Sequence, residues 1–334
     1  MDAELRAAER ALGHGSGRED AHVGVAVATM RAIVHEGQEQ PRRALAAGQR
    51  AAADAERLGD LRELAKAYNV IDWAHAFLGQ MDQAVHHTRV VEIYQMLGEP
   101  HRAAAALGNQ GAFHYWRGRW DEALECYRRA HDAYVQTGDV VNAAVQQGNV
   151  AELLISRGQF AAAREEIAAA GQTHRAVGFV DGALFDEVQL GRLLLGEGDP
   201  EKAAIALESV LEEATSLSLH GTALEAAVHL ARCRVEQGRG QEALAVLAGA
   251  EQAAGSEAAL LAASVELVRA EALARTGDVE GAGRQRAIGI AAARSMHLQY
   301  ELGLLLVLED APAAQSEGRA LLDALGVEAT QVSA

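Results

Sequence analysis

Apolar and small side chains recur along the chain with the spacing of paired amphipathic helices. Trp120, Ala123 and Tyr127 follow one another at intervals of three and four residues, which places them on one face of a helix. In the stretch before them, Leu107 and Gly111 belong to a matching stripe, and a short turn at 117–119 separates the two stretches. This pattern predicts two antiparallel helices joined by a tight turn.

The two-helix unit repeats along the sequence. Alanines stand 39 or 40 residues apart at Ala44, Ala84, Ala123, Ala163, Ala203, Ala243 and Ala282, and a glycine lies five residues before each of the last six. So regular a period is typical of a repeat array, in which each unit covers the apolar face of the next. We therefore expect helix pairs that contact only their neighbours.

Glycine followed by an acidic residue marks the ends of these units, as at Gly138 and Asp139. Glycine suits a left-handed helix C-terminus and aspartate suits the N-cap of the next helix. The fold class that this predicts is all-α, a right-handed superhelical α-solenoid of about seven to eight antiparallel helix pairs. The expected pairs cover residues 18–58, 60–97, 99–137, 139–177, 179–218, 220–254 and 256–295, with a leading helix and flexible joint at 1–17, a capping pair at 297–325 and a tail at 326–334.

The segment GRWDEALECYRRA resembles the second half of a tetratricopeptide repeat, through Gly118, Trp120, Ala123, Tyr127 and Ala130. The resemblance covers about residues 20–295, with a repeat longer than the usual length of about 34 residues. This longer repeat is similar to the C-terminal region of bacterial adenylate-cyclase-like, LuxR-like and MalT-like regulatory ATPases. The resemblance implies an interaction module whose first helices line a concave surface.

The chain carries a net charge of −17, with 47 Asp and Glu against 30 Lys and Arg. This balance argues against nucleic-acid binding, which needs clustered basic residues, and permits a basic partner. No apolar run approaches the ~20 residues of a membrane span, and the N-terminus lacks a signal-peptide pattern. With only two cysteines, Cys126 and Cys233, we expect a cytoplasmic protein that does not contact membranes.

Motifs for catalysis and metal binding are missing from the sequence. The glycine-rich stretch at 13–20 lacks the lysine of a phosphate loop, and no HExxH, CxxC or GxSxG is present. His86 and His87 are adjacent, so on a helix they point about 100° apart and do not readily share an ion. We expect no enzyme activity, no cofactor and no metal; an enzymatic alternative would need His114, Glu152 and Arg192 to converge.

Two polar columns follow the repeat on the first helices. The column two residues before the small packing residue reads Asn109, Asn149, Gln189 and His229, and the column one residue after it includes Trp73, Glu152, Arg192 and Arg232. An amide both donates and accepts, so the first column could hold the backbone of an extended chain; the alternative is that it bonds the neighbouring helix.

Tyr115 and Trp116 should point into the groove or the adjacent pair. The expected partner-binding residues are Asn69, Trp73, Asn109, Tyr115, Trp116, Asn149, Glu152, Gln189, Arg192, His229 and Arg232.

The leading hypothesis is a non-catalytic interaction or sensor module in bacterial signalling or regulation. It would bind a peptide, protein segment or effector along the concave surface. The alternative is a structural oligomerisation scaffold within a larger assembly, for which homo-oligomers are expected.

Overall fold

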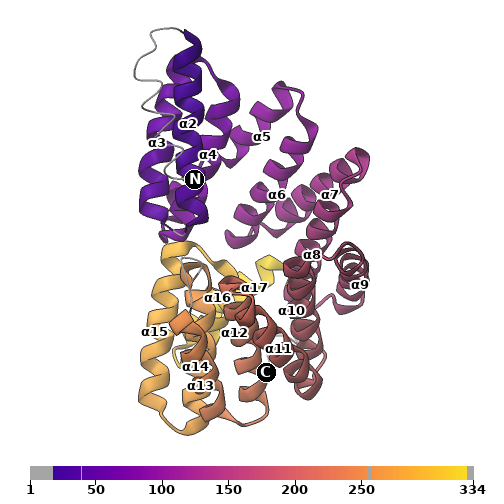
Figure 1. Ribbon diagram of the computed structural model, residues 1–334. Coiled ribbons are helices and arrows are strands. Elements are labelled where there is room, and N and C mark those ends of the chain that lie inside the picture. Colours follow the sequence, from indigo (N-terminus) through magenta and orange to yellow (C-terminus); the bar gives the residue numbers. More distant parts are fainter. Residues whose placement is uncertain (1–17, 39, 254–257, 329–334) are drawn as a thin grey trace. The chain divides into compact units, whose positions relative to one another are not determined.

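The computed structural model describes residues 18–38, 40–253 and 258–328. In this part of the chain all regular secondary structure is helical, with sixteen α-helices, one short 3-10 helix and no strand (Figure 1). The expected all-α fold of antiparallel helix pairs is confirmed. The leading helix and joint expected at 1–17, and residues 329–334 of the expected tail, lie outside the described residues.

The helices follow one another with short turns. Their bounds are α2 (Arg18–Gly37), α3 (Pro41–Leu58), α4 (Leu61–Phe77), η1 (Met81–Gln83), α5 (His87–Met96), α6 (Pro100–Trp116), α7 (Trp120–Thr137), α8 (Val140–Ser156), α9 (Phe160–Val177), α10 (Val180–Gly196), α11 (Pro200–Ser216), α12 (His220–Glu236), α13 (Gly240–Ala253), α14 (Ala258–Thr276), α15 (Val279–Met296), α16 (Gln299–Val307) and α17 (Pro312–Leu325). The chain divides into two compact units, Met1–Gln110 (unit 1) and Gly111–Ala334 (unit 2), which we describe separately.

The turns between pairs have the predicted chemistry. Gly138 ends α7 with φ of 78°, in the left-handed region, and the side chain of Asp139 accepts a hydrogen bond from the Asn142 backbone N–H at 3.0 Å. Asp60 caps α4 in the same way, and Asp199 does so for α11 at the turn inside the pair α10–α11. These local interactions satisfy backbone groups that would otherwise be unpaired at helix ends.

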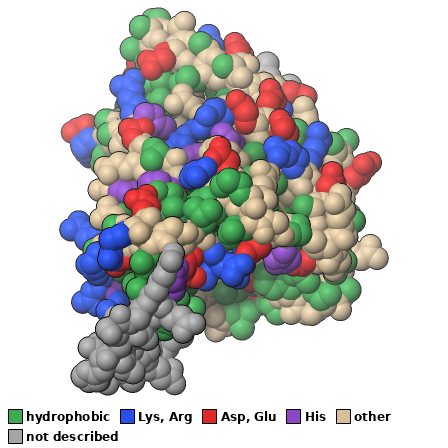
Figure 2. Space-filling model, turned by 90° about the horizontal axis from the view of Figure 1, so that it is seen from above, with side chains coloured by type: hydrophobic (Ala, Val, Ile, Leu, Met, Phe, Trp, Pro, Cys, Tyr) green, Lys and Arg blue, Asp and Glu red, His purple; other side chains and the backbone are tan. Residues whose placement is uncertain are grey.

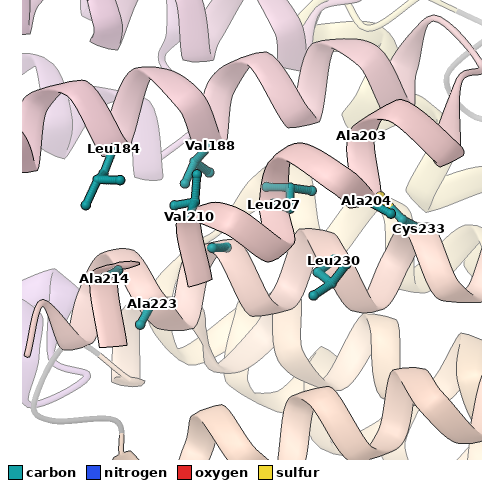
Figure 3. Packing of buried hydrophobic residues seen from close by; sticks show 11 residues of the cluster. Leu184, Val188, Ala203, Ala204, Leu207, Val210, Ala214, Ala223, Leu230 and Cys233 are labelled. Carbon is teal, nitrogen blue, oxygen red and sulfur yellow. The ribbon is translucent and has the colours of Figure 1, made fainter. Parts of the chain in front are cut away.

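Helices within a pair cross at a small residue. A methyl group added at Gly191 in α10 would lie 2.6 Å from Cγ of Leu207 in α11, so only glycine admits this contact. Around the crossing, side chains from α10, α11 and α12 point toward one another in a continuous core (Figure 3). This core contains Leu184, Val188, Ala203, Ala204, Leu207, Val210, Ala214, Ala223, Ala226, Leu230 and Cys233.

In unit 1 the continuous second helix expected within 60–97 is wrong. The chain forms η1, leaves helical geometry at Ala84, and resumes as α5 at His87. Asp72 bonds the chain at this break; it lies 39 residues before Gly111 and takes the crossing position that small residues hold in later repeats. Its buried carboxylate accepts the His86 backbone N–H at 2.8 Å, so the break supplies a backbone donor to a buried charge.

The same carboxylate brings the two neighbouring histidines together. Nδ1 of His86 lies 2.8 Å and Nδ1 of His87 lies 3.3 Å from the Asp72 oxygens. The expectation that these rings point apart is therefore wrong, because His86 precedes the helix rather than lying within it. Burial alone would raise the pKa of Asp72, but the hydrogen bonds from His86 and His87 outweigh it and hold that pKa below its usual value.

In unit 2 the expectation of contacts between neighbouring pairs alone is also wrong. The last pair, α16–α17, packs back onto the first elements of the unit, and we call this contact the seam. Arg157 Nε donates to the Leu325 carbonyl at 3.1 Å, and the rings of Trp120 and Tyr300 lie 5.4 Å apart. The α16–α17 pair therefore contacts α7 and the turn after α8, which are not its neighbours in the repeat order.

A buried hydrogen bond between a histidine and an aspartate joins α9 to α10. Nδ1 of His174 lies 2.7 Å from Oδ2 of Asp186, and both residues are almost fully buried. Burial raises the pKa of Asp186 to about 6, although the hydrogen bond with His174 opposes the shift. Removal from water therefore dominates the energetics of this carboxyl group.

The surface carries charges of both signs. On the face shown in Figure 2, basic and acidic side chains are interspersed rather than separated into blocks. Among the described helices, none has both the length and the apolar character needed to cross a bilayer. Within the same part of the chain, no three His, Cys, Asp or Glu side chains gather as a set of metal ligands.

The crossing at Gly191 gives a stability prediction. We expect Gly191→Ala to lower the free energy of unfolding by about 1–2 kcal/mol, because overpacking outweighs the gain in helix propensity. Gly249→Ala is the matched control, since Gly249 is exposed in α13 with open space around it, and should raise stability by up to about 1 kcal/mol. Urea denaturation measures both, and equal effects of the two changes would contradict the steric argument.

The buried Asp186 gives a pH prediction. Its folded pKa of about 6 exceeds its unfolded value, so its contribution to stability is greatest below pH ~4 and is lost as pH rises through about 6. Asp186→Asn should remove this dependence. When the pH is lowered from 7.5 to 5, the free energy of unfolding of the wild type, measured by urea denaturation, should rise by about 1–2 kcal/mol relative to that of the variant. Parallel pH profiles of the two proteins would show that the carboxyl group is not perturbed.

The seam gives a prediction for local opening. Arg157→Ala removes the bond to the Leu325 carbonyl, the ion pair with Asp121 and the contact with the Trp120 ring. Amides of α16 and α17 should then exchange about tenfold faster in hydrogen–deuterium exchange mass spectrometry. Arg164→Ala removes an exposed ion pair with Glu197 and should leave exchange in α16 and α17 unchanged. Unaltered exchange in Arg157→Ala would mean that Arg157 does not hold the seam.

Candidate functional site

The first helices of successive pairs in unit 2 bring their inward polar side chains into one network. Arg192 in α10 donates from Nη1 to Glu152 Oε1 of α8 and to Gln189 Oε1, both at 3.0 Å. Its Nη2 donates to Ser156 Oγ at 3.1 Å. Gln189 Nε2 in turn donates to Glu225 Oε1 of α12 at 3.2 Å. We call these five residues the inner network, since they tie three consecutive first helices together.

Arg192 is the centre of the inner network. Its side chain is only 11% exposed, and Oε1 of Glu225 in α12 lies 3.8 Å from the same Nη1 that bonds Glu152. Burial would lower the pKa of Arg192, but the charges of Glu152 and Glu225 outweigh it and raise that pKa above its usual value. The guanidinium is therefore a fixed cation whose donors are bonded by acceptors of α8 and of its own helix, α10.

Aromatic side chains lie beside the inner network. The Tyr115 hydroxyl is 3.3 Å from Ser156 Oγ, and the Tyr115 ring stacks on Trp120 at 5.8 Å. Tyr300 of α16 contacts the other side of this group through Trp120. Next to it, Glu301 accepts a weak hydrogen bond from Ser264 Oγ at 3.4 Å, and burial raises the pKa of Glu301. The last pair thus contributes side chains to the same inner surface.

The column of Asn109, Asn149, Gln189 and His229 contains side chains that are hydrogen-bonded within the array and side chains that are not. Asn109 donates to Asn69 at 2.8 Å within unit 1, and Gln189 is buried in the inner network. For these two the alternative interpretation, bonding to a neighbouring helix, describes the geometry. Asn149 and His229 are partly exposed, and among the described residues neither side chain has a hydrogen-bond partner.

The electrostatics of His229 follow from its surroundings. Burial, together with the charges of Arg192 and Arg232, lowers the pKa of His229 well below its usual value. The imidazole is therefore neutral at pH 7 and offers one donor and one acceptor. Asn149 on α8 and His229 on α12 are thus two polar groups with unused bonding capacity on the inner face.

The other expected residues are less closely connected. Trp73 packs beside Phe77 at 5.6 Å in unit 1, and Trp116 meets Phe113 edge-on at 5.7 Å in unit 2. Arg232 is partly exposed; its pKa lies above the usual value because the charge of Glu271 outweighs burial. The structure therefore joins Tyr115, Glu152, Gln189 and Arg192 directly, and leaves Trp73 and the Asn69–Asn109 pair as separate groups in unit 1.

Sequence reasoning missed four members of this surface, namely Ser156, Glu225, Tyr300 and Glu301. Two of them could have been found from spacing. Ser156 lies four residues after Glu152, and Glu225 lies four residues before His229, so each is one helical turn from a column residue. Tyr300 and Glu301 carried no such signal, because the last pair does not continue the 40-residue period and reaches the surface only through the seam.

Comparisons with known proteins agree with this architecture. Residues 102–170 match the family model described as tetratricopeptide repeat. A solved Rap protein, complexed with Competence and Sporulation Factor, superposes with a TM-score of 0.63 at 16% identity, covering 91% of this chain and 87% of that one. NprR in complex with its cognate peptide NprX superposes with a TM-score of 0.56 at 17% identity, covering 81% and 83%. By sequence, no curated protein matches. At these identities the likeness establishes the fold, which is that of tetratricopeptide-like helical arrays.

Proposed function

We propose that this chain is a non-catalytic interaction module that binds an extended peptide or protein segment along the inner surface of unit 2. The observation that carries the proposal is Asn149, a partly exposed amide with no partner among the described residues, three positions before Glu152 on α8, the residue that bonds the Arg192 guanidinium. An amide in this position can both donate to and accept from a peptide group. It can therefore bind a backbone without reading its side chains.

The inner network supplies the rigidity that such binding needs. Arg192 is held by acceptors from α8 and α10, so a ligand group that meets it does not have to order a flexible side chain. The partly exposed ring of Tyr115, which stacks on the buried Trp120, lies beside it, and aromatic side chains are favoured anchors at interfaces. Together these groups provide polar contacts for the backbone and apolar contacts for side chains.

The charge of the inner surface favours a basic segment. Glu152, Glu225, Glu271 and Glu301 face it, against the two guanidiniums of Arg192 and Arg232. Burial raises the pKa of Glu271, and its Oε2 has no hydrogen-bond partner among the described residues. A ligand ammonium or guanidinium would relieve this excess of carboxylate.

The solved structures support the same assignment. The NprR structure holds its cognate peptide on a related fold, and the likeness covers most of this chain. With the similarity of the repeats to the C-terminal regions of bacterial adenylate-cyclase-like, LuxR-like and MalT-like regulators, we place the module in bacterial regulation. We propose a cytoplasmic location on the same grounds.

A peptide array tests the proposal with the full chain. A synthetic array of random, unstructured peptides is screened, and the tightest binder is measured by isothermal titration calorimetry. Asn149→Ala should weaken its binding about fivefold to tenfold, because one hydrogen-bonding amide is lost while the fold is untouched. Glu165→Ala, an exposed change on α9, is the control and should bind as the wild type does. Unchanged affinity in Asn149→Ala, or no binder in the array, would remove the proposal.

A further inference from the structure

Exposed apolar side chains of unit 2 gather at three turns between helix pairs. Among the described residues of unit 2, nine large apolar side chains are exposed, and six of them lie in the segments 135–140, 177–180 and 217. Their exposed fractions run from 37% to 55%, so they are not part of the core. We call these six the turn ridge: Val135, Val140, Val177, Phe179, Val180 and Leu217. Single exposed apolar residues need no explanation, but a gathered set indicates an interaction surface.

The three turns lie at one edge of the unit. Each turn contains a residue in the left-handed region, Gly138, Gly178 and Ser218, at intervals of 40 residues. The helices that follow them, α8, α10 and α12, pack beside one another in the same direction, so their first turns share an edge. Thr222 Oγ1 donates a hydrogen bond to Asp181 Oδ1 at 3.1 Å, which joins the N-terminal ends of α12 and α10 directly.

Carboxylates border the turn ridge. Asp132, Asp181 and Glu213 are exposed beside the first, second and third turn respectively. The nearby cation Arg175 is offset by Glu187 at 3.7 Å. Unit 2 as a whole carries 32 Asp and Glu against 18 Lys and Arg. An apolar ridge with acidic borders repels a second copy of itself and anionic lipid, and attracts a basic partner.

We propose that the turn ridge docks a basic amphipathic helix of a partner protein. Neighbouring helices of the array lie about 8–10 Å apart, so the three turns present apolar side chains at about that spacing. Two turns of an α-helix rise about 10.5 Å, so apolar residues seven positions apart in the partner would meet successive turns. Lysine or arginine beside these residues would face the bordering carboxylates. The partner is thus a helix of about four turns, apolar on one stripe and basic on its flanks.

The turn ridge is separate from the proposed peptide surface. Val140 and Asn149 lie nine residues apart on α8, which is about 13 Å along the helix axis. The ridge is at the helix ends, whereas Asn149 is in the middle of α8. A protein could therefore hold a peptide at the inner surface and a helix at the ridge, and Asn149→Ala should not alter helix docking.

The test uses the full chain and a synthetic helix as the probe. The probe is a leucine–lysine peptide of about 18 residues with leucines on one face, and fluorescence anisotropy measures its binding. The variant Val140→Ser/Val180→Ser/Leu217→Ser should bind it at least about tenfold more weakly than the wild type. The matched control is Ile205→Ser/Val279→Ser/Ile288→Ser, which removes three exposed apolar side chains away from the ridge and should bind within about twofold of the wild type.

A scrambled peptide of the same composition separates docking from bulk charge attraction, and it should bind at least about tenfold more weakly than the amphipathic probe. Equal binding of the two peptides, or equal binding by the ridge variant and the wild type, overturns the proposal. It is also overturned if light scattering shows that the wild type is a dimer and the ridge variant a monomer. The same holds if the wild type binds anionic phosphatidylserine vesicles and the ridge variant does not. Those outcomes would assign the ridge to a second copy or to a lipid surface.

Discussion

The close crossing of the two helices in each pair is the constraint on which the rest of this structure depends. Where glycine stands at the crossing, as at Gly191, the partner helix packs against bare backbone and Leu207 fills the space a side chain would need. Where Asp72 takes that position, the second helix breaks and its backbone bonds the carboxylate instead. The repeat in which the second helix divides into η1 and α5 is thus one with a carboxylate at the crossing.

A regular crossing also fixes where polar groups gather. Because successive first helices are held at a constant spacing, side chains 40 residues apart, such as Glu152 and Arg192, meet directly. Burying this ion pair costs desolvation energy, which at Arg192 the charges of Glu152 and Glu225 outweigh. Its gain is geometric, since the guanidinium is held in one orientation on the surface where we propose that a peptide binds.

The seam separates unit 2 from an open-ended array. The hydrogen bond between Arg157 and the Leu325 carbonyl joins residues 168 positions apart, and Tyr300 reaches the aromatic group at Trp120. The α16–α17 pair therefore also adds Tyr300 and Glu301 to the inner surface. In contrast, the turn ridge lies at helix ends that no later element covers among the described residues, which is why its apolar side chains stay available to a partner.

The sequence by itself determined the helix pairs, their turns and their crossings, because each depends on residues within one period of about 40. The sequence also shows Asp72 at a position where the other repeats have small residues, and this is the repeat whose second helix is broken. Only the tertiary structure decided which members of a column remain unpaired. Asn109 and Asn149 occupy the same repeat position, yet one bonds Asn69 and the other has no partner among the described residues. Only the tertiary structure revealed the seam, because contacts between residues 118–157 and 299–328 join segments that share no period and no local signal.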